Sequence, residues 1–157
     1  LKGVPAFYLP ALLASENDIK SFSMTGQRRD LNREKFKSEN LLSVLNNPES
    51  NANKNLKYLR NAMDVRSELK QFHPCSEMKC LSKGRSDIVV IKRSKGPESV
   101  FAIHNMTENK INYQLNDNDL PKIIDNDFNA HDFLTSTKYN CKNISLDPFQ
   151  VIWLSAL

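Results

Sequence analysis

The chain has 157 residues, of which 39% are hydrophobic and 25% are charged, so it is long enough to bury a hydrophobic core. Its net charge of +4 permits phosphate or nucleic-acid partners and requires neither. No stretch reaches the roughly 18 to 20 consecutive apolar residues that a transmembrane helix needs, which excludes a membrane-spanning segment of that kind.

Residues 3–9 (GVPAFYL) form an almost uninterrupted apolar run. A half-buried antiparallel strand would alternate apolar and polar positions, whereas this run favours a parallel strand covered on both faces. A polar stretch follows, with Asn17-Asp18 and then the arginine-rich residues 25–33. That order predicts one strand of an α/β barrel and its loop, and such loops carry the active sites of barrels. Because no second run of this kind follows, we expect the partner strands upstream of Leu1 and interpret the chain as the C-terminal piece of a larger protein.

These segments also share a pattern with a known enzyme family. Residues 3–8 (GVPAFY) resemble the eighth barrel strand of glycoside hydrolase family 13, the α-amylase superfamily. Residues 12–18 (LLASEND), 25–26 (TG) and 29–36 (RDLNREKF) resemble its sucrose phosphorylase branch, including the glucosylglycerate phosphorylases. In that branch a small-residue-x-Asn-Asp turn precedes an Arg-x-Ile-Asn-Arg segment, and here Leu31 replaces the usual Ile. The ending at residues 32–35 (NREK) is more similar to the glucosylglycerate-type enzymes.

Two helices are predicted between residues 36 and 72. The first begins near Ser38, which we expect to cap it, and ends at Asn46-Asn47-Pro48, because proline stops a helix. The second runs from near Ser50 to Gln71. Its apolar positions recur every three or four residues and so form one buried stripe: Leu56, Leu59, Met63, Val65, Leu69 and Phe72. The resemblance makes it the eighth barrel helix, and residues 1–74 the C-terminal end of an incomplete (β/α)8 barrel.

From Met78 the apolar period changes to two, which is the period of strands. Residues 87–93 and 99–104 predict a hairpin around a Gly96-Pro97 turn. Residues 111–115 predict a strand with one buried face, and residues 116–129 a loop. Residues 139–145 and 150–154 predict the final strands, with Phe149 and Trp153 in the core. The resemblance implies a small antiparallel β-sandwich as C-terminal domain over residues 75–157, so the expected fold class is α/β plus β.

The three cysteines (Cys75, Cys80, Cys141) cannot all pair within the chain. Their spacing does not match a zinc site, which has two close pairs. Reduced, inert thiols in a cytoplasmic protein are therefore the interpretation that we favour.

The resemblance implies a retaining glucosyl transfer by double displacement. An aspartate attacks the anomeric carbon, a glutamate protonates the leaving group, and phosphate then attacks the glucosyl-enzyme. Both carboxylates belong to central barrel strands that this chain lacks, so we expect no catalytic residue here and no activity from the chain alone. The mechanism needs no cofactor or metal. The expected partners are an α-glucoside, inorganic phosphate and the upstream remainder of the barrel, with neither nucleic acid nor membrane.

What the loop can supply is positive charge for phosphate, because a guanidinium fork donates two parallel hydrogen bonds and stays ionised. By resemblance Arg29 is the arginine that faces phosphate or the acceptor. Asp30 is expected to orient Arg29, Gln27 to reach the acceptor, and Arg33 either to tie the loop to a carboxylate or to bind the anion. Three residues are expected to shape the loop: Asn17 and Asp18 through side-chain bonds to the backbone, and Gly26 through its conformational freedom.

Two further hypotheses stay open at this point. The chain could be a noncatalytic, mildly basic α+β module whose arginine loop binds an anion. Alternatively, the parent enzyme could be an α-glucoside hydrolase of the same superfamily.

Overall fold

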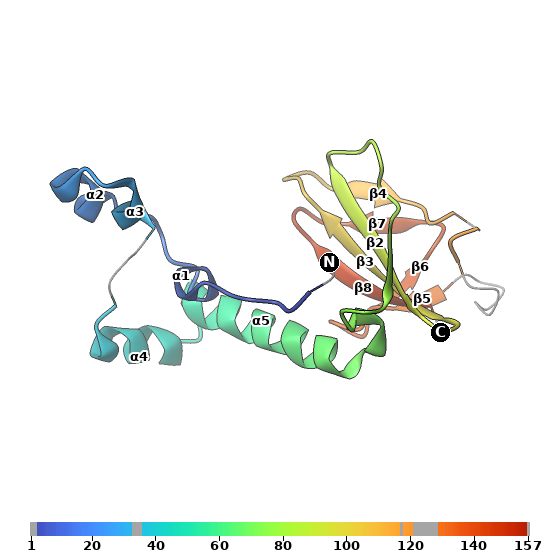
Figure 1. Ribbon diagram of the computed structural model, residues 1–157, viewed down its shortest axis with the longest axis horizontal. Coiled ribbons are helices and arrows are strands. Elements are labelled where there is room, and N and C mark those ends of the chain that lie inside the picture. The colour runs from blue at the N-terminus through green and yellow to red at the C-terminus, as the bar shows by residue number, and fades with distance from the viewer. Residues whose placement is uncertain (1–2, 33–35, 117, 121–128, 157) are drawn as a thin grey trace. The chain divides into compact units, whose positions relative to one another are not determined.

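The computed structural model describes residues 3–32, 36–116, 118–120 and 129–156 (Figure 1). The chain divides into two compact units, Pro5–Asp64 and Val65–Leu157, the latter together with Leu1–Val4. The division falls inside a helix, between Asp64 and Val65, and the segment after that helix contacts strands of the C-terminal unit. None of the helices described is long and apolar enough to cross a membrane.

The unit Pro5–Asp64 is helical in the part that the structure describes. Its helices are α1 (Leu9–Leu12), α2 (Ile19–Thr25), α3 (Arg28–Leu31), α4 (Ser38–Asn46) and α5 (Asn51–Glu68), the last of which continues into the other unit. The two predicted helices are present as α4 and α5, but α5 ends at Glu68, before the expected end at Gln71. The stripe predicted to be buried is only half-buried, except for Phe72. Ser38 is the first residue of α4 and not its cap, since Lys37 occupies the cap position. Ser50 caps α5, because its Oγ accepts the Asn53 N–H at 3.1 Å.

The strand predicted over residues 3–9 is wrong for this structure. Residues 3–8 pair with no strand among the described residues, and their side chains are exposed, including Val4 at 84% and Tyr8 at 54%. A strand exists only where a neighbour completes its hydrogen bonds, and an apolar run alone does not supply one. The chain instead enters α1, where Pro10 lies in the first helical turn, a position that tolerates the missing N–H.

The C-terminal unit contains a four-stranded antiparallel sheet, in the order β1-β2-β3-β8 (Figure 1). Its strands are β1 (Glu77–Cys80), β2 (Ile88–Lys95), β3 (Glu98–Asn105) and β8 (Val151–Ala156), and the 3₁₀ helix η1 (Lys70–Phe72) precedes them. The predicted hairpin is confirmed, since β2 and β3 pair with Lys95 opposite Glu98 around the Gly96-Pro97 turn. Two smaller ladders join β4 (Ile111–Tyr113) to β7 (Ile144–Leu146), and β5 (Asn129–His131) to β6 (Lys138–Asn140).

The core of this unit lies between the sheet and the smaller ladders. The sheet contributes Ile88, Val90, Phe101, Ile103, Ile152 and Leu154, and the opposite layer contributes Leu115, Ala130, Cys141, Ile144 and Leu146. The predicted antiparallel β character of this region is therefore confirmed. Phe149 corrects one expectation: it is 65% exposed in the turn before β8, outside the core. Trp153 is only partly buried, because successive strand residues face opposite sides of the sheet and its neighbours Ile152 and Leu154 face the core. Its ring packs on that of Phe72, with 4.8 Å between the ring centroids.

Candidate functional site

The loop that the sequence singles out folds into a closed helical turn within the unit Pro5–Asp64. α2 and α3 follow one another, joined by Gly26 and Gln27. At the base of the turn the Asp18 N–H donates to the Leu31 carbonyl at 2.7 Å. This bond ties the two ends of the segment together, so its geometry is set locally.

Asp18 and Gly26 fix the two ends of α2. Asp18 caps its start, because Oδ1 accepts the Ser21 N–H at 2.8 Å and Oδ2 accepts the Ser21 hydroxyl at 2.6 Å. Gly26 ends it in the left-handed conformation with φ 65°, and its N–H donates to Phe22 O at 2.8 Å. Glycine reaches that conformation without steric cost. Asn17 is exposed, and its carbonyl accepts the Ile19 N–H at 2.9 Å.

Thr25 connects the two helices at the tip of the turn. Its hydroxyl lies 2.6 Å from Asp30 Oδ2 and 3.0 Å from the Ser21 carbonyl, and it accepts the Gln27 N–H at 3.2 Å. A hydroxyl has one proton, and the shorter bond to a charged carboxylate is the stronger of its two choices. Sequence reasoning assigned no role to Thr25. The sequence offers only a weak indication of the Thr25–Asp30 contact: a hydroxyl residue stands five positions before an acidic residue, with a glycine between them.

Arg29 lies beside this carboxylate on α3. Its Nε is 3.9 Å from Asp30 Oδ1, and its side chain is 67% exposed while that of Asp30 is 27% exposed. Gln27 and Arg28 are also exposed. The structure thus brings Gln27, Arg29 and Asp30 to one turn that Asp18 and Gly26 shape. Arg33 lies outside the described residues.

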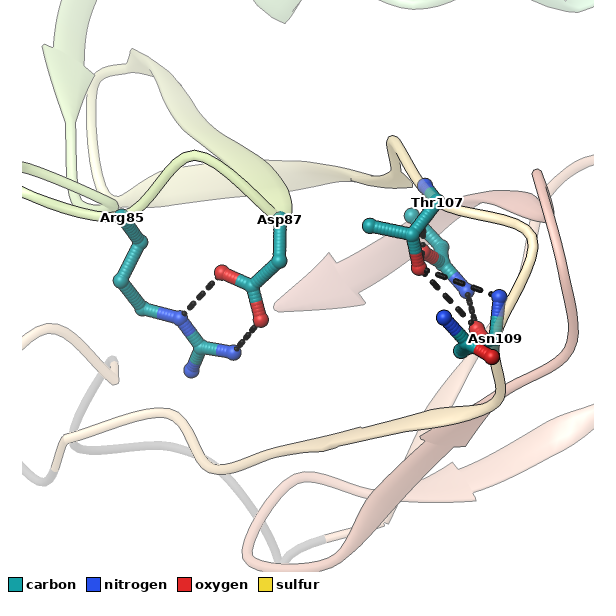
Figure 2. Close-up of polar contacts among 5 residues, drawn as sticks. Arg85, Asp87, Thr107 and Asn109 are labelled. Carbon is teal, nitrogen blue, oxygen red and sulfur yellow. Dashed lines mark hydrogen bonds and ion pairs between the residues drawn. The ribbon is translucent and has the colours of Figure 1, made fainter.

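Arg85 and Asp87 in the C-terminal unit show a fully closed pair for comparison (Figure 2). Arg85 Nε donates to Asp87 Oδ1 at 2.8 Å, and Arg85 Nη2 donates to Asp87 Oδ2. These bonds lower the pKa of Asp87 and raise that of Arg85. Both Arg85 donors that face the carboxylate, Nε and Nη2, are therefore hydrogen-bonded. The Arg29 contact of 3.9 Å is longer than a hydrogen bond, and the Arg29 side chain is 67% exposed, so its guanidinium is accessible from solvent.

An apolar groove of about 400 Å³ lies on the same unit as the turn. Its lining is mostly apolar and also includes three polar residues: Phe7, Leu12, Leu56, Leu59, Met63, Asn53, Lys57 and Arg60. In the part of the chain that the structure describes, no three His, Cys, Asp or Glu side chains gather as a metal site would require.

Comparison with known proteins finds relatives that share part of this sequence. No family model matches the chain. The chain is 32% identical over 108 residues to a glucosylglycerate phosphorylase of Allomeiothermus silvanus, covering 69% of this chain and 19% of that protein. It is 23% identical over 153 residues to that of Escherichia coli, covering 97% of this chain and 25% of the relative. The resemblance to glucosylglycerate phosphorylases is confirmed.

Solved structures of family 13 enzymes share the fold. AmyP in complex with maltose aligns with a TM-score of 0.56 at 16% identity, over 69% of this chain and 22% of that one. Trehalulose synthase MutB aligns with a TM-score of 0.56 at 13% identity, over 73% and 19%. The trehalose-6-phosphate hydrolase of Bacillus licheniformis aligns with a TM-score of 0.51 at 20% identity, over 74% and 20%. These neighbours combine a barrel with a C-terminal domain.

The chain spans only a small part of the curated relatives that it matches. The covered share of their length is 19%, 25% and 15%. The similarity therefore concerns a segment of those relatives.

Proposed function

We propose that the chain is the C-terminal part of a retaining glucosyltransferase that moves a glucosyl group from an α-glucoside to phosphate. The similarity to three glucosylglycerate phosphorylases carries this proposal. Their name makes glucosylglycerate the first candidate substrate, and the loop pattern makes sucrose the second. In this assignment residues 1–74 complete the barrel and residues 75–157 form the C-terminal domain of a cytoplasmic enzyme.

The exposed apolar side chains of the unit Pro5–Asp64 support the proposal that this unit contacts another part of the same enzyme. Among its described residues only Leu13 and Ala52 are buried apolar side chains. Large apolar side chains remain exposed, including Ile19 at 68%, Met24 at 79% and Leu42 at 60%. A contiguous exposed apolar surface marks an interaction site in soluble proteins, and the apolar groove is such a surface on this unit. We assign the groove, together with these exposed side chains, to contact with the remainder of the barrel.

Arg29 is the residue that we place against phosphate. In the second half-reaction a phosphate oxygen bonds to the anomeric carbon while the bond to the enzyme carboxylate breaks, which gives an α-glucosyl phosphate and regenerates the carboxylate. A phosphate anion beside a carboxylate-rich site needs fixed positive charge to offset the repulsion. The open guanidinium of Arg29 supplies it, with Asp30 beside it and Gln27 placed to contact the acceptor. Arg33 follows in the same segment and adds a second positive charge.

Replacement of Arg29 by alanine in the full-length enzyme tests this role. We expect the KM for phosphate to rise by about 10- to 100-fold, the factor for losing hydrogen bonds to a charged group. Glucosyl transfer to water should change little, because water needs no cation. Arg28→Ala is the matched control, since Arg28 is exposed on the same short helix. Equal losses with phosphate and with water would contradict the assignment.

The same assays separate phosphorylase from hydrolase. A phosphorylase releases glucosyl phosphate at a rate that depends on the phosphate concentration. An α-glucoside hydrolase releases free glucose at a rate independent of phosphate. The second result would replace the proposed reaction by hydrolysis.

A further inference from the structure

Thr25 carries an inference that rests on the proposed function and extends it. We infer that Thr25 is a positioning residue for phosphate: its hydroxyl holds the Asp30 carboxylate so that Asp30 orients the Arg29 guanidinium without occupying it. The observation behind this is the bond of 2.6 Å between Thr25 Oγ1 and Asp30 Oδ2 beside the 3.9 Å contact of Arg29 with the other oxygen, Oδ1.

Comparison of Arg29–Asp30 with Arg85–Asp87 shows why the hydroxyl matters. In the Arg85–Asp87 pair both carboxylate oxygens accept from the guanidinium (Figure 2). In the Arg29–Asp30 pair the Thr25 hydroxyl holds Oδ2 at 2.6 Å, and Oδ1 stays 3.9 Å from Arg29 Nε, so the pair is not closed. Without the hydroxyl, the Asp30 carboxylate loses the bond that fixes its orientation and can turn both oxygens toward Arg29. The pair would then close in the bidentate manner that guanidinium and carboxylate favour, and Asp30 would compete with phosphate.

Thr25 itself is held in place by its neighbours. It is the last residue of α2, and Gly26 follows it in the left-handed conformation that ends the helix. Its hydroxyl also accepts the Gln27 N–H at 3.2 Å, which joins α2 to the segment leading into α3. The residue is exposed, so its methyl group adds little to packing. The hydroxyl is therefore the part of the side chain that acts.

Kinetics of the full-length enzyme with Thr25→Val test the inference, because valine keeps the shape and removes the hydroxyl. At saturating α-glucoside the KM for inorganic phosphate should rise by about tenfold, with kcat nearly unchanged, because Asp30 then competes with phosphate for about one charged hydrogen bond of Arg29. Thr25→Ser restores the hydroxyl and should keep the KM within about twofold of the parent value. Ser23→Ala is the matched control on the same helix, since the Ser23 hydroxyl donates to the Ile19 carbonyl at 2.8 Å, within its own helix.

Adding Asp30→Asn to Thr25→Val separates positioning from a loss of local structure. A neutral amide cannot close on Arg29 as an anion, so the double variant should bind phosphate better than Thr25→Val alone. An additive or larger loss would overturn the inference. So would a Thr25→Val enzyme that behaves like Ser23→Ala while Arg29→Ala still weakens phosphate use, an outcome that leaves the proposed site intact. If Arg29→Ala has no effect, the proposed site itself fails, and the role of Thr25 fails with it.

Discussion

Asp132 is fully buried, yet both oxygens of its carboxylate are hydrogen-bonded. Oδ1 accepts the Trp153 N–H at 2.7 Å and the Leu134 N–H at 3.2 Å, and Oδ2 accepts the Thr135 hydroxyl at 2.6 Å. It thereby links the turn after β5 to β8. A buried acceptor with this many donors stabilises a fold mainly because those donors would otherwise remain unsatisfied.

Asp132→Ala should therefore destabilise the C-terminal unit by at least about 3 kcal/mol, because three donors lose their acceptor. Asp132→Asn keeps one acceptor oxygen and should cost less, about 1–2 kcal/mol. Urea unfolding followed by the fluorescence of Trp153, the single tryptophan of the chain, measures both losses. Asp147→Asn is the control, since the Asp147 side chain is 71% exposed in a surface ion pair. Equal midpoints for Asp132→Ala and this control would contradict the role of Asp132.

The hairpin of β2 and β3 depends on a two-residue turn. Gly96 is its first central residue and has φ 61°, the pattern of a type II′ turn. An added Cβ at Gly96 would meet no atom within 4 Å. The requirement for glycine is therefore one of backbone conformation and not of space.

Replacement of Gly96 separates these two causes. Gly96→Val should destabilise the C-terminal unit by about 1–2 kcal/mol, because a β-branched residue is strained at positive φ. Gly96→Asn should cost clearly less, since asparagine tolerates this region better than other non-glycine residues. The urea midpoints of the two variants measure which one loses more stability. Lys95→Ala, a change at the exposed neighbouring residue, is the control. Equal losses for Val and Asn would instead indicate a steric cause.

The elements that the sequence predicts well are those whose pattern is completed within the chain. The hairpin, β4 and the two helices α4 and α5 each show their period and their turn or stop signal locally. The strand prediction for residues 3–9 is wrong because a strand needs a neighbouring strand, and the apolar run does not specify one. Phe149 fails for a related reason: it occupies a turn with φ 54°, where an aromatic residue cannot follow the alternation of the strand beside it.

The candidate site divides in the same way. Gly26 and Asp18 could be predicted because a left-handed helix end and a helix cap are local properties of the backbone. The approach of Thr25 to Asp30 could not, because the turn geometry between α2 and α3 brings them together. In our proposal this contact decides whether Asp30 leaves the Arg29 guanidinium accessible to phosphate. The sequence alone could therefore not predict that accessibility.

At the scale of the whole molecule, the two units differ in how much apolar surface they bury. The C-terminal unit has a cluster of fully buried side chains that includes Ile88, Phe101, Ile103 and Leu154. The described part of Pro5–Asp64 has Leu13 and Ala52 as its buried apolar residues. Because burial of apolar surface is the main stabilising term, the two units should differ in local stability.

Hydrogen exchange of the 157-residue chain measures this difference. Amides of β2, β3 and β8 should exchange at least about tenfold more slowly than amides of α2, α3 and α4, because the strand amides open only with the core. In the full-length enzyme the helical amides should gain protection, because the remainder of the barrel would then cover Ile19, Met24 and Leu42. Equal protection of helices and strands in the 157-residue chain would contradict the expected difference in stability. Unchanged protection of the helices in the full-length enzyme would contradict the assignment of their apolar surface to the barrel.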